Sequence, residues 1–433
     1  MPGVMREPLF FAALTGQAGW QRKRGELLIN VDNVAVANDD LAGNLYGSYQ
    51  TKAGTLGVLD LTVSLTRGDV RRAARYTPLA ALDKEDNDWL NGAMLAGYTE
   101  DFRVRVKGNL SDFPLDGTED ALLEVGGHAR DVAMEFDKDW PRIENISGEF
   151  WIRGNKMEVK SPSATILDAH LQNLTVTIAD LLSDDLPLEI KGNAAGASNT
   201  FLQFIQQSPV RGYIDGFTDG MSANGNGHLD LFAHIPLLGD KPVKVSGTFR
   251  LQDNDLNLGE GVPLLRKTRG ELSFTESGMQ ASGVSAEILG GAASINVQTA
   301  AGGVVHAIVK GRSNLDAMRK IDPHPLLNYL YGGAAWDADI TVTKKSAQLT
   351  INSNLHGLGS NLPQPFAKPA NEAMPLRLEK KNVADGQDVI IVLLGKLLSA
   401  RLARRDENGA MAIKRGVINF GGDGVVSSQG RRS

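Results

Sequence analysis

The chain has 433 residues, with 45 lysines and arginines against 51 aspartates and glutamates, and a formal net charge of -6. This charge gives no electrostatic reason to expect a nucleic acid, and no aromatic residues for base stacking interleave with the short basic runs Gln21–Arg24 and Arg401–Arg405. There is no cysteine, which excludes disulfides, cysteine-bound zinc and thiol catalysis.

The sequence carries neither a recognisable export signal nor a membrane span. The segment that begins at Met1 has too few basic residues and too short an apolar run for a signal peptide. The longest apolar run, Val389–Leu394, is far shorter than the ~20 residues that a spanning helix needs. Because strand-like sequence begins at once and the last residues carry no cap, we expect the chain to be a piece of a longer protein.

Alternation of polar and apolar residues dominates the chain. It is clear in Arg103–Leu110, in His228–Ile235, and in Asp337–Thr343 with its return strand Gln348–Asn352. A period of two places alternate side chains on opposite faces of a strand. We therefore predict antiparallel sheet with one face in water and one dry, apolar face. The 48 glycines, more than usual, are typical of turns and bends in such a chain.

Helical patterns are short. Asp69–Tyr76, Asn199–Gln207 and Asn314–Ile321 each follow a strand and end shortly before a proline. Asp69 is a suitable N-cap for the first, and Asn or Thr for the second. Three weaker helical patterns cover Asp86–Leu95, Val210–Phe217 and Pro325–Tyr331.

Two kinds of internal repeat run through the chain. The strand, helix and proline passage occurs three times, at Leu59–Pro78, Leu188–Pro209 and His306–Pro325. A second passage, Trp140–Leu167, matches Val262–Leu289 without a gap at a shift of 122 positions. Such repeats are typical of an array of supersecondary units. We predict one continuous segment over 1–433, with repeat units of approximately 1–115, 116–240, 241–360 and 361–433.

The few helices are too small to cover the apolar side of the sheet. At ~4.8 Å between strands, roughly two dozen strands in one sheet extend over about 100 Å, whereas a ten-residue helix is only ~15 Å long. Either two sheets close on each other as sandwiches, or one sheet curls into a trough that something else covers. Since no linkers separate compact domains, the predicted fold is mainly β: an elongated, curled antiparallel sheet with a few short helices.

Several segments resemble the YhdP branch of the AsmA-like proteins of the Gram-negative envelope. They are Asp88–Leu115, Asp139–Val159, Phe201–Leu237, Gly270–Gly291 and Ser353–Glu379, in family order. The resemblance implies a repeating β-groove that conducts phospholipid acyl chains across the periplasm, between the inner and outer membranes. It also implies an inner-membrane anchor, which this chain lacks. Its protein partners are not indicated.

An uncovered apolar face needs a ligand, because exposed apolar surface costs ~25 cal/mol per Å². Flexible hydrocarbon requires no directional contacts, so a floor of aliphatic residues is a sufficient binding site. The same residues would fill the core of a sandwich, and the pattern alone does not separate the two. The predicted groove lining is Val104, Val106, Leu110, Phe150, Ile152, Met157, Val159, Leu229, Leu231, Ile235, Leu272, Phe274, Met279, Ile340, Val342, Leu349 and Ile351.

No residue pattern indicates catalysis or a cofactor. His228 and His234 lie on one strand, ~20 Å apart, which is too far for a shared metal. The acidic and glycine-rich stretch Asp215–Gly227 lacks the spacing of a calcium loop. We predict no catalytic residues, no metal and no cofactor. The alternative function is a structural or adhesive β-repeat envelope protein with closed sandwiches and no lipid, and an enzyme acting on envelope polysaccharide comes third.

Overall fold

The computed structural model describes residues 5, 7–78, 84–112, 121–259, 262–300, 302–321, 323–343, 346–384, 386–407 and 410–421. Over these residues the protein is mainly β with a few short helices, as the sequence predicts. One antiparallel sheet holds 23 strands, and two short strands form a second. No other large sheet occurs among the described strands, so the sandwich alternative, which needs two facing sheets, is wrong.

The chain divides into two compact units, described separately below. Unit 1 contains Met1–Tyr213 and His228–Ser246, and unit 2 contains Ile214–Gly227 and Gly247–Ser433. Two strands, β12 (Ser222–Pro236) and β13 (Lys244–Asn257), have residues in both.

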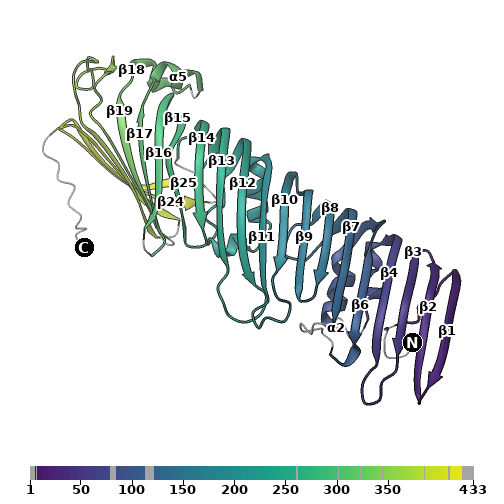
Figure 1. Cartoon of the computed structure of the whole chain (residues 1–433). Coiled ribbons are helices and arrows are strands. Elements are labelled where there is room, and N and C mark those ends of the chain that lie inside the picture. The colour runs from purple at the N-terminus through teal and green to yellow at the C-terminus, as the bar shows by residue number, and fades with distance from the viewer. Residues whose placement is uncertain are drawn as a thin grey trace. The chain divides into compact units, whose positions relative to one another are not determined.

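Unit 1 is a meander in which nearly every strand pairs with its neighbours in the chain (Figure 1). The short strand β5 pairs with the end of β4 and with β7, whereas β6 pairs with β4 and β7 along the rest of their length. The strands are β1 (Ala13–Lys23), β2 (Glu26–Ala37), β3 (Leu41–Gln50), β4 (Val58–Asp69), β5 (Met94–Thr99), β6 (Arg103–Asn109), β7 (Leu122–Met134), β8 (Ile143–Arg153), β9 (Lys156–Ile166), β10 (Ala169–Ile178) and β11 (Pro187–Ala197).

Unit 2 repeats this arrangement, with antiparallel pairs from β14 to β25. Strands β18 and β21 pair with each other, and Ser360 of β21 also bridges Lys368. The strands are β14 (Leu265–Thr275), β15 (Gly278–Ile288), β16 (Gly291–Ala300), β17 (Val304–Arg312), β18 (Leu330–Gly332), β19 (Ala335–Thr343), β20 (Ser346–Ser353), β21 (Leu358–Ser360), β22 (Leu376–Ala384), β23 (Gln387–Leu394), β24 (Leu398–Glu407) and β25 (Ala410–Phe420).

The three predicted strand-to-helix passages are confirmed. The helical segments are η1 (Val70–Arg72), α1 (Ala73–Tyr76), α2 (Lys84–Ala93), η2 (Leu110–Asp112), α3 (Ser198–Gln206), α4 (Val210–Tyr213), α5 (Leu315–Ile321) and η3 (Pro325–Tyr329). The Asp69 carboxylate accepts a hydrogen bond from the Arg71 N–H, as an N-cap does. The predicted polar cap of α3 is wrong, because the N-cap is Ala197, without a side-chain bond. The segment predicted as a helix over 210–217 makes only the single turn α4.

The repeat at a shift of 122 positions is visible in the backbone. Positive φ angles occur at Leu167 and Leu289, and also at Asn145 and Lys267. Residues other than glycine rarely adopt this conformation, which occurs at bulges and tight turns. Strand β8 and the β9–β10 turn of unit 1 therefore bend at positions equivalent to strand β14 and the β15–β16 turn of unit 2.

Candidate functional site

The candidate site is the apolar face of the sheet in each unit. In an antiparallel pair, residues directly opposite each other point to the same side. We call such a set of opposed residues a row. One row of unit 1 crosses nine strands and is apolar throughout: Val34, Leu45, Val63, Val104, Val125, Ile152, Met157, Ile178 and Leu188.

The row unites three of the predicted lining residues of unit 1. Val104, Ile152 and Met157 lie in it, and Val106 lies in the neighbouring row with Leu61 and Leu123. A further row pairs Phe150 with Val159, and Val159 with Val176. Leu110 is different, because β6 ends at Asn109 and Leu110 begins the turn η2. Its direction therefore does not follow from strand alternation.

Unit 2 has a corresponding row over six strands: Leu272, Ala281, Val297, Ala307, Ile340 and Leu349. Phe274 lies opposite Met279, and each lies two residues from its neighbour in the row, Leu272 or Ala281, on the same face. Val342 lies opposite Val305, and Ile351 lies opposite Ala338. All seven predicted lining residues of unit 2 therefore share one face.

Three predicted lining residues lie on β12. Leu229, Leu231 and Ile235 alternate with His228, Asp230 and His234, with Phe232 the one exception, and share their parity with Ala233, which is buried. They therefore point to the same side of the strand as that alanine.

All seventeen predicted residues are half-buried: none is fully exposed and none is enclosed by the protein. Sequence reasoning missed most other members of the rows, such as Val63 and Val125, although each has the apolar parity of its strand. It also missed the charged residues Lys380, Asp388 and Arg404, which occupy that parity in β22, β23 and β24. Extending the alternation from Val392 back to Asp388 would have identified β23 as unusual.

The opposite face carries ion pairs on the surface. Glu158 lies 2.5 Å from Lys160 and 3.0 Å from Lys156, and these two lysines lower the pKa of its carboxyl to about 2. Arg153 pairs with Glu124 across β7 and β8 at 3.3 Å. In unit 2, Arg377 and Lys381 likewise lower the pKa of the Glu379 carboxyl. The sheet therefore separates a solvated, charged side from an apolar one, as the alternation predicts.

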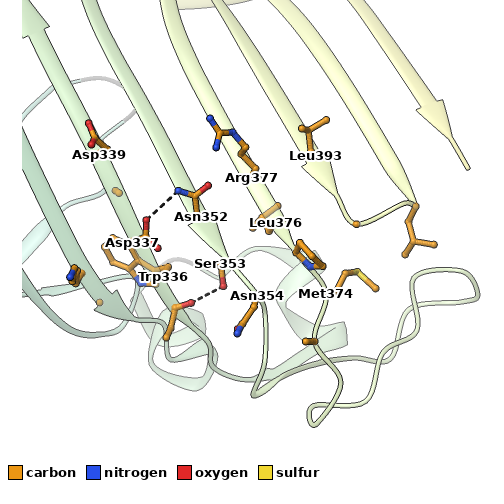
Figure 2. A pocket seen from close by; sticks show the side chains of 18 of the residues that line it. Trp336, Asp337, Asp339, Asn352, Ser353, Asn354, Met374, Leu376, Arg377 and Leu393 are labelled. Atoms are coloured by element: carbon orange, nitrogen blue, oxygen red, sulfur yellow. Dashed lines mark hydrogen bonds between the residues drawn. The ribbon is translucent and has the colours of Figure 1, made fainter. Parts of the chain in front are cut away.

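A hollow of about 1450 Å³ lies at the ends of the unit 2 strands (Figure 2). Two of its polar side chains are bonded: Asn352 donates to Asp337 at 3.2 Å, and the Ser353 hydroxyl donates to the Ala335 carbonyl at 2.7 Å. Trp336 and Leu376 contribute apolar surface. This mixed, internally bonded lining does not single out a ligand.

No group of three or more metal-ligating side chains occurs among the described residues. His228 lies 3.3 Å from Asp230, and His234 lies 3.5 Å from Glu189, so each histidine has its own carboxylate neighbour. Within the described ranges, no helix is long and apolar enough to cross a lipid bilayer.

Comparison with known proteins gives two matches. A family model described as YhdP protein matches residues 1–432. The intermembrane phospholipid transporter YhdP of Escherichia coli (strain K12) is 22% identical over 386 residues, which cover 87% of this chain and 30% of the relative. The chain thus spans less than a third of that relative, whose named role is not enzymatic. No solved structure matches.

Proposed function

Because this chain belongs to the YhdP protein family, we propose that it is a non-enzymatic, lipid-conducting segment of a bridge-like protein. It moves phospholipid between the inner and outer membranes across the periplasm. Acyl chains slide along the apolar face, and headgroups project into water. As part of this proposal, such a protein contacts both membranes and is held by an inner-membrane anchor.

The observation that carries the proposal is the nine-strand row of unit 1. A soluble protein without a ligand gains by burying such a surface, at ~25 cal/mol per Å². Eight of its nine residues are instead half-buried, and only Ile178 is enclosed. A lipid tail, which is flexible and apolar, matches a floor that is continuous across strands and carries no hydrogen-bonding side chains. The shared face of unit 2 supports the same proposal.

The test compares two identical substitutions on opposite faces. Val106→Asp places a carboxylate on the apolar face of β6, where it repels hydrocarbon. Val58→Asp is the control, since Val58 lies on β4 with the opposite parity to Leu61 and is 37% exposed. Each full chain is purified, and its bound lipid is extracted and quantified by mass spectrometry.

We expect phospholipid to co-purify with the unaltered chain and with Val58→Asp, and to fall several-fold with Val106→Asp. In the full-length protein, Val106→Asp and Leu231→Asp are expected to block lipid transport without blocking export. Lipid-free, monodisperse unaltered protein would contradict the proposal, and so would undiminished transport in both variants.

A further inference from the structure

Lys380, Asp388 and Arg404 are charged side chains on the mainly apolar face of unit 2, at an end where Asn382 and Asp406 share their parity. Lys380 stands opposite Ile390, which stands opposite Leu402, so the lysine lies within an apolar row. Asp388 lies two residues before Ile390 and stands opposite Arg404. These three residues, the charged cluster, therefore point to the same side as the proposed lipid floor.

The cluster is tightly bonded and largely enclosed. Arg404 donates two hydrogen bonds to Asp388, from Nε at 2.8 Å and from Nη2 at 2.6 Å. The Lys380 Nζ lies 3.7 Å from the same carboxylate. The side chain of Asp388 is 3% exposed, that of Arg404 is 17% exposed and that of Lys380 is 23% exposed. Lys380 is thus held less tightly by Asp388 than Arg404 is.

The position of the cluster is more informative than its bonds. Ionised groups are costly to enclose, and charges that face hydrocarbon usually mark a functional position. In β19 and β20 the corresponding end of the face is still apolar, with Val342 opposite Ala347. Four residues further along β23, at ~13 Å, the row of Leu378, Val392 and Ala400 is also apolar. The cluster therefore marks a boundary at which the apolar stripe ends.

We propose that the charged cluster binds the phosphate of a phospholipid whose acyl chains lie on the row of Leu378, Val392 and Ala400. This inference rests on the proposed function. The Asp388 carboxylate balances Arg404 and holds it in place, so that the ammonium of Lys380, with its single long contact to Asp388, attracts the phosphate. Lys380 lies two residues, ~7 Å, from Leu378, and Asp388 lies four residues, ~13 Å, from Val392, which leaves room for a glycerol backbone between the ammonium and the tails. Each lipid then has one preferred position along β22–β24.

The test uses water-soluble lipids with identical tails. Dihexanoyl phosphatidylglycerol carries the phosphate, dihexanoylglycerol lacks it, and inorganic phosphate lacks the tails. Binding of each to the full chain is measured by isothermal titration calorimetry. Lys380→Met removes the charge but keeps the length of the side chain and leaves the Asp388–Arg404 pair intact. Lys381→Met is the matched control, because Lys381 is the next residue, 48% exposed, and pairs with Glu379 on the other face.

We expect the unaltered chain to bind the phosphate-bearing lipid about tenfold more tightly than dihexanoylglycerol, as for one charge-assisted contact. Lys380→Met should abolish this preference and Lys381→Met should retain it. Equal affinity for both lipids, or a preference that survives Lys380→Met, would overturn the inference while the apolar floor stands. Inorganic phosphate that binds as tightly as the lipid would overturn it as well, because the tails would contribute nothing. If neither lipid binds, the proposed function fails too.

Discussion

The apolar faces of the two units differ in how far the protein itself covers them. In unit 1 the long row from Val34 to Leu188 is half-buried almost throughout. In unit 2 part of the same face forms a buried cluster: Leu265, Val284, Ala286, Ile288, Ala293, Ile295, Val309 and Ala338. Larger side chains, among them Trp336 and Ile340, pack against this cluster.

This difference follows from side-chain size. Three members of the unit 2 cluster are alanines, and small residues let larger neighbours close over them. In unit 1 the row consists of valine, leucine, isoleucine and methionine, and the buried alanines Ala164, Ala169 and Ala194 lie outside it. Unit 2 therefore contains a connected buried cluster, whereas the long row of unit 1 is only half-buried.

The largest expected effect tests this core directly. Ile295→Asp places a carboxylate between Val284 and Val309, at a position that is 8% exposed. We expect it to destabilise unit 2 by about 3–5 kcal/mol, since an unpaired charge is enclosed among apolar groups. Val106→Asp, on the half-buried face of unit 1, should cost about 1 kcal/mol or less. Peptide-resolved hydrogen exchange measures the loss of stability in both variants. Equal losses would contradict the stated difference in burial between the two faces.

Removing a carboxylate charge from the sheet, Asp388 in unit 2 or Glu158 in unit 1, should have a smaller effect on stability. Arg404 lowers the pKa of the enclosed Asp388 carboxyl below its ordinary value of 3.8. A carboxyl with a lowered pKa contributes stability above its ordinary pKa and loses it as the pH falls through the lowered value. Asp388→Asn should therefore destabilise unit 2 by about 2 kcal/mol at pH 7.

This difference from the unaltered chain should shrink when urea denaturation is repeated near pH 3. Glu158→Gln in unit 1 is the control, because its partners are on the surface and its loss should leave the denaturation midpoint unchanged. If the destabilisation by Asp388→Asn did not change with pH, the ionised Asp388 carboxylate would not be its cause.

The smallest expected effect is the difference in stability between Gly148→Ala and Gly270→Ala, which change equivalent glycines of the two repeated hairpins. A Cβ on Gly148 would lie 2.1 Å from the Lys160 carbonyl oxygen, on the neighbouring strand. On Gly270 it would meet the Val284 side chain at 2.8 Å and the Val284 Cα at 3.0 Å, with φ at +149°. Since a side chain yields more easily than a paired backbone, Gly148→Ala should cost about 1–3 kcal/mol and Gly270→Ala less. Hydrogen-exchange protection of the two hairpins measures this, and the reverse order would show that backbone strain at Gly270 dominates.

Much of the fold could be predicted because alternation and caps are local signals. The parity of Val104 and Val106 placed both on the apolar face, and Asp69 marked the start of its helix. The cap of α3 failed because Ala197 precedes the helix, and no local signal identifies it. The row that joins Val34 to Leu188 depends on register across nine strands, which bulges shift and a single sequence does not encode locally. Asp388 was missed because its partner Arg404 lies sixteen residues away, on the next strand.

The meander has a consequence for how the molecule forms. In each unit, pairing joins strands that follow one another in the chain, or skip a single short one. Folding then requires only small loops to close, and contacts at short separation form quickly. The ribbon can grow while synthesis is still under way, each emerging hairpin adding to the last open edge, with no need to wait for the far end of the polypeptide.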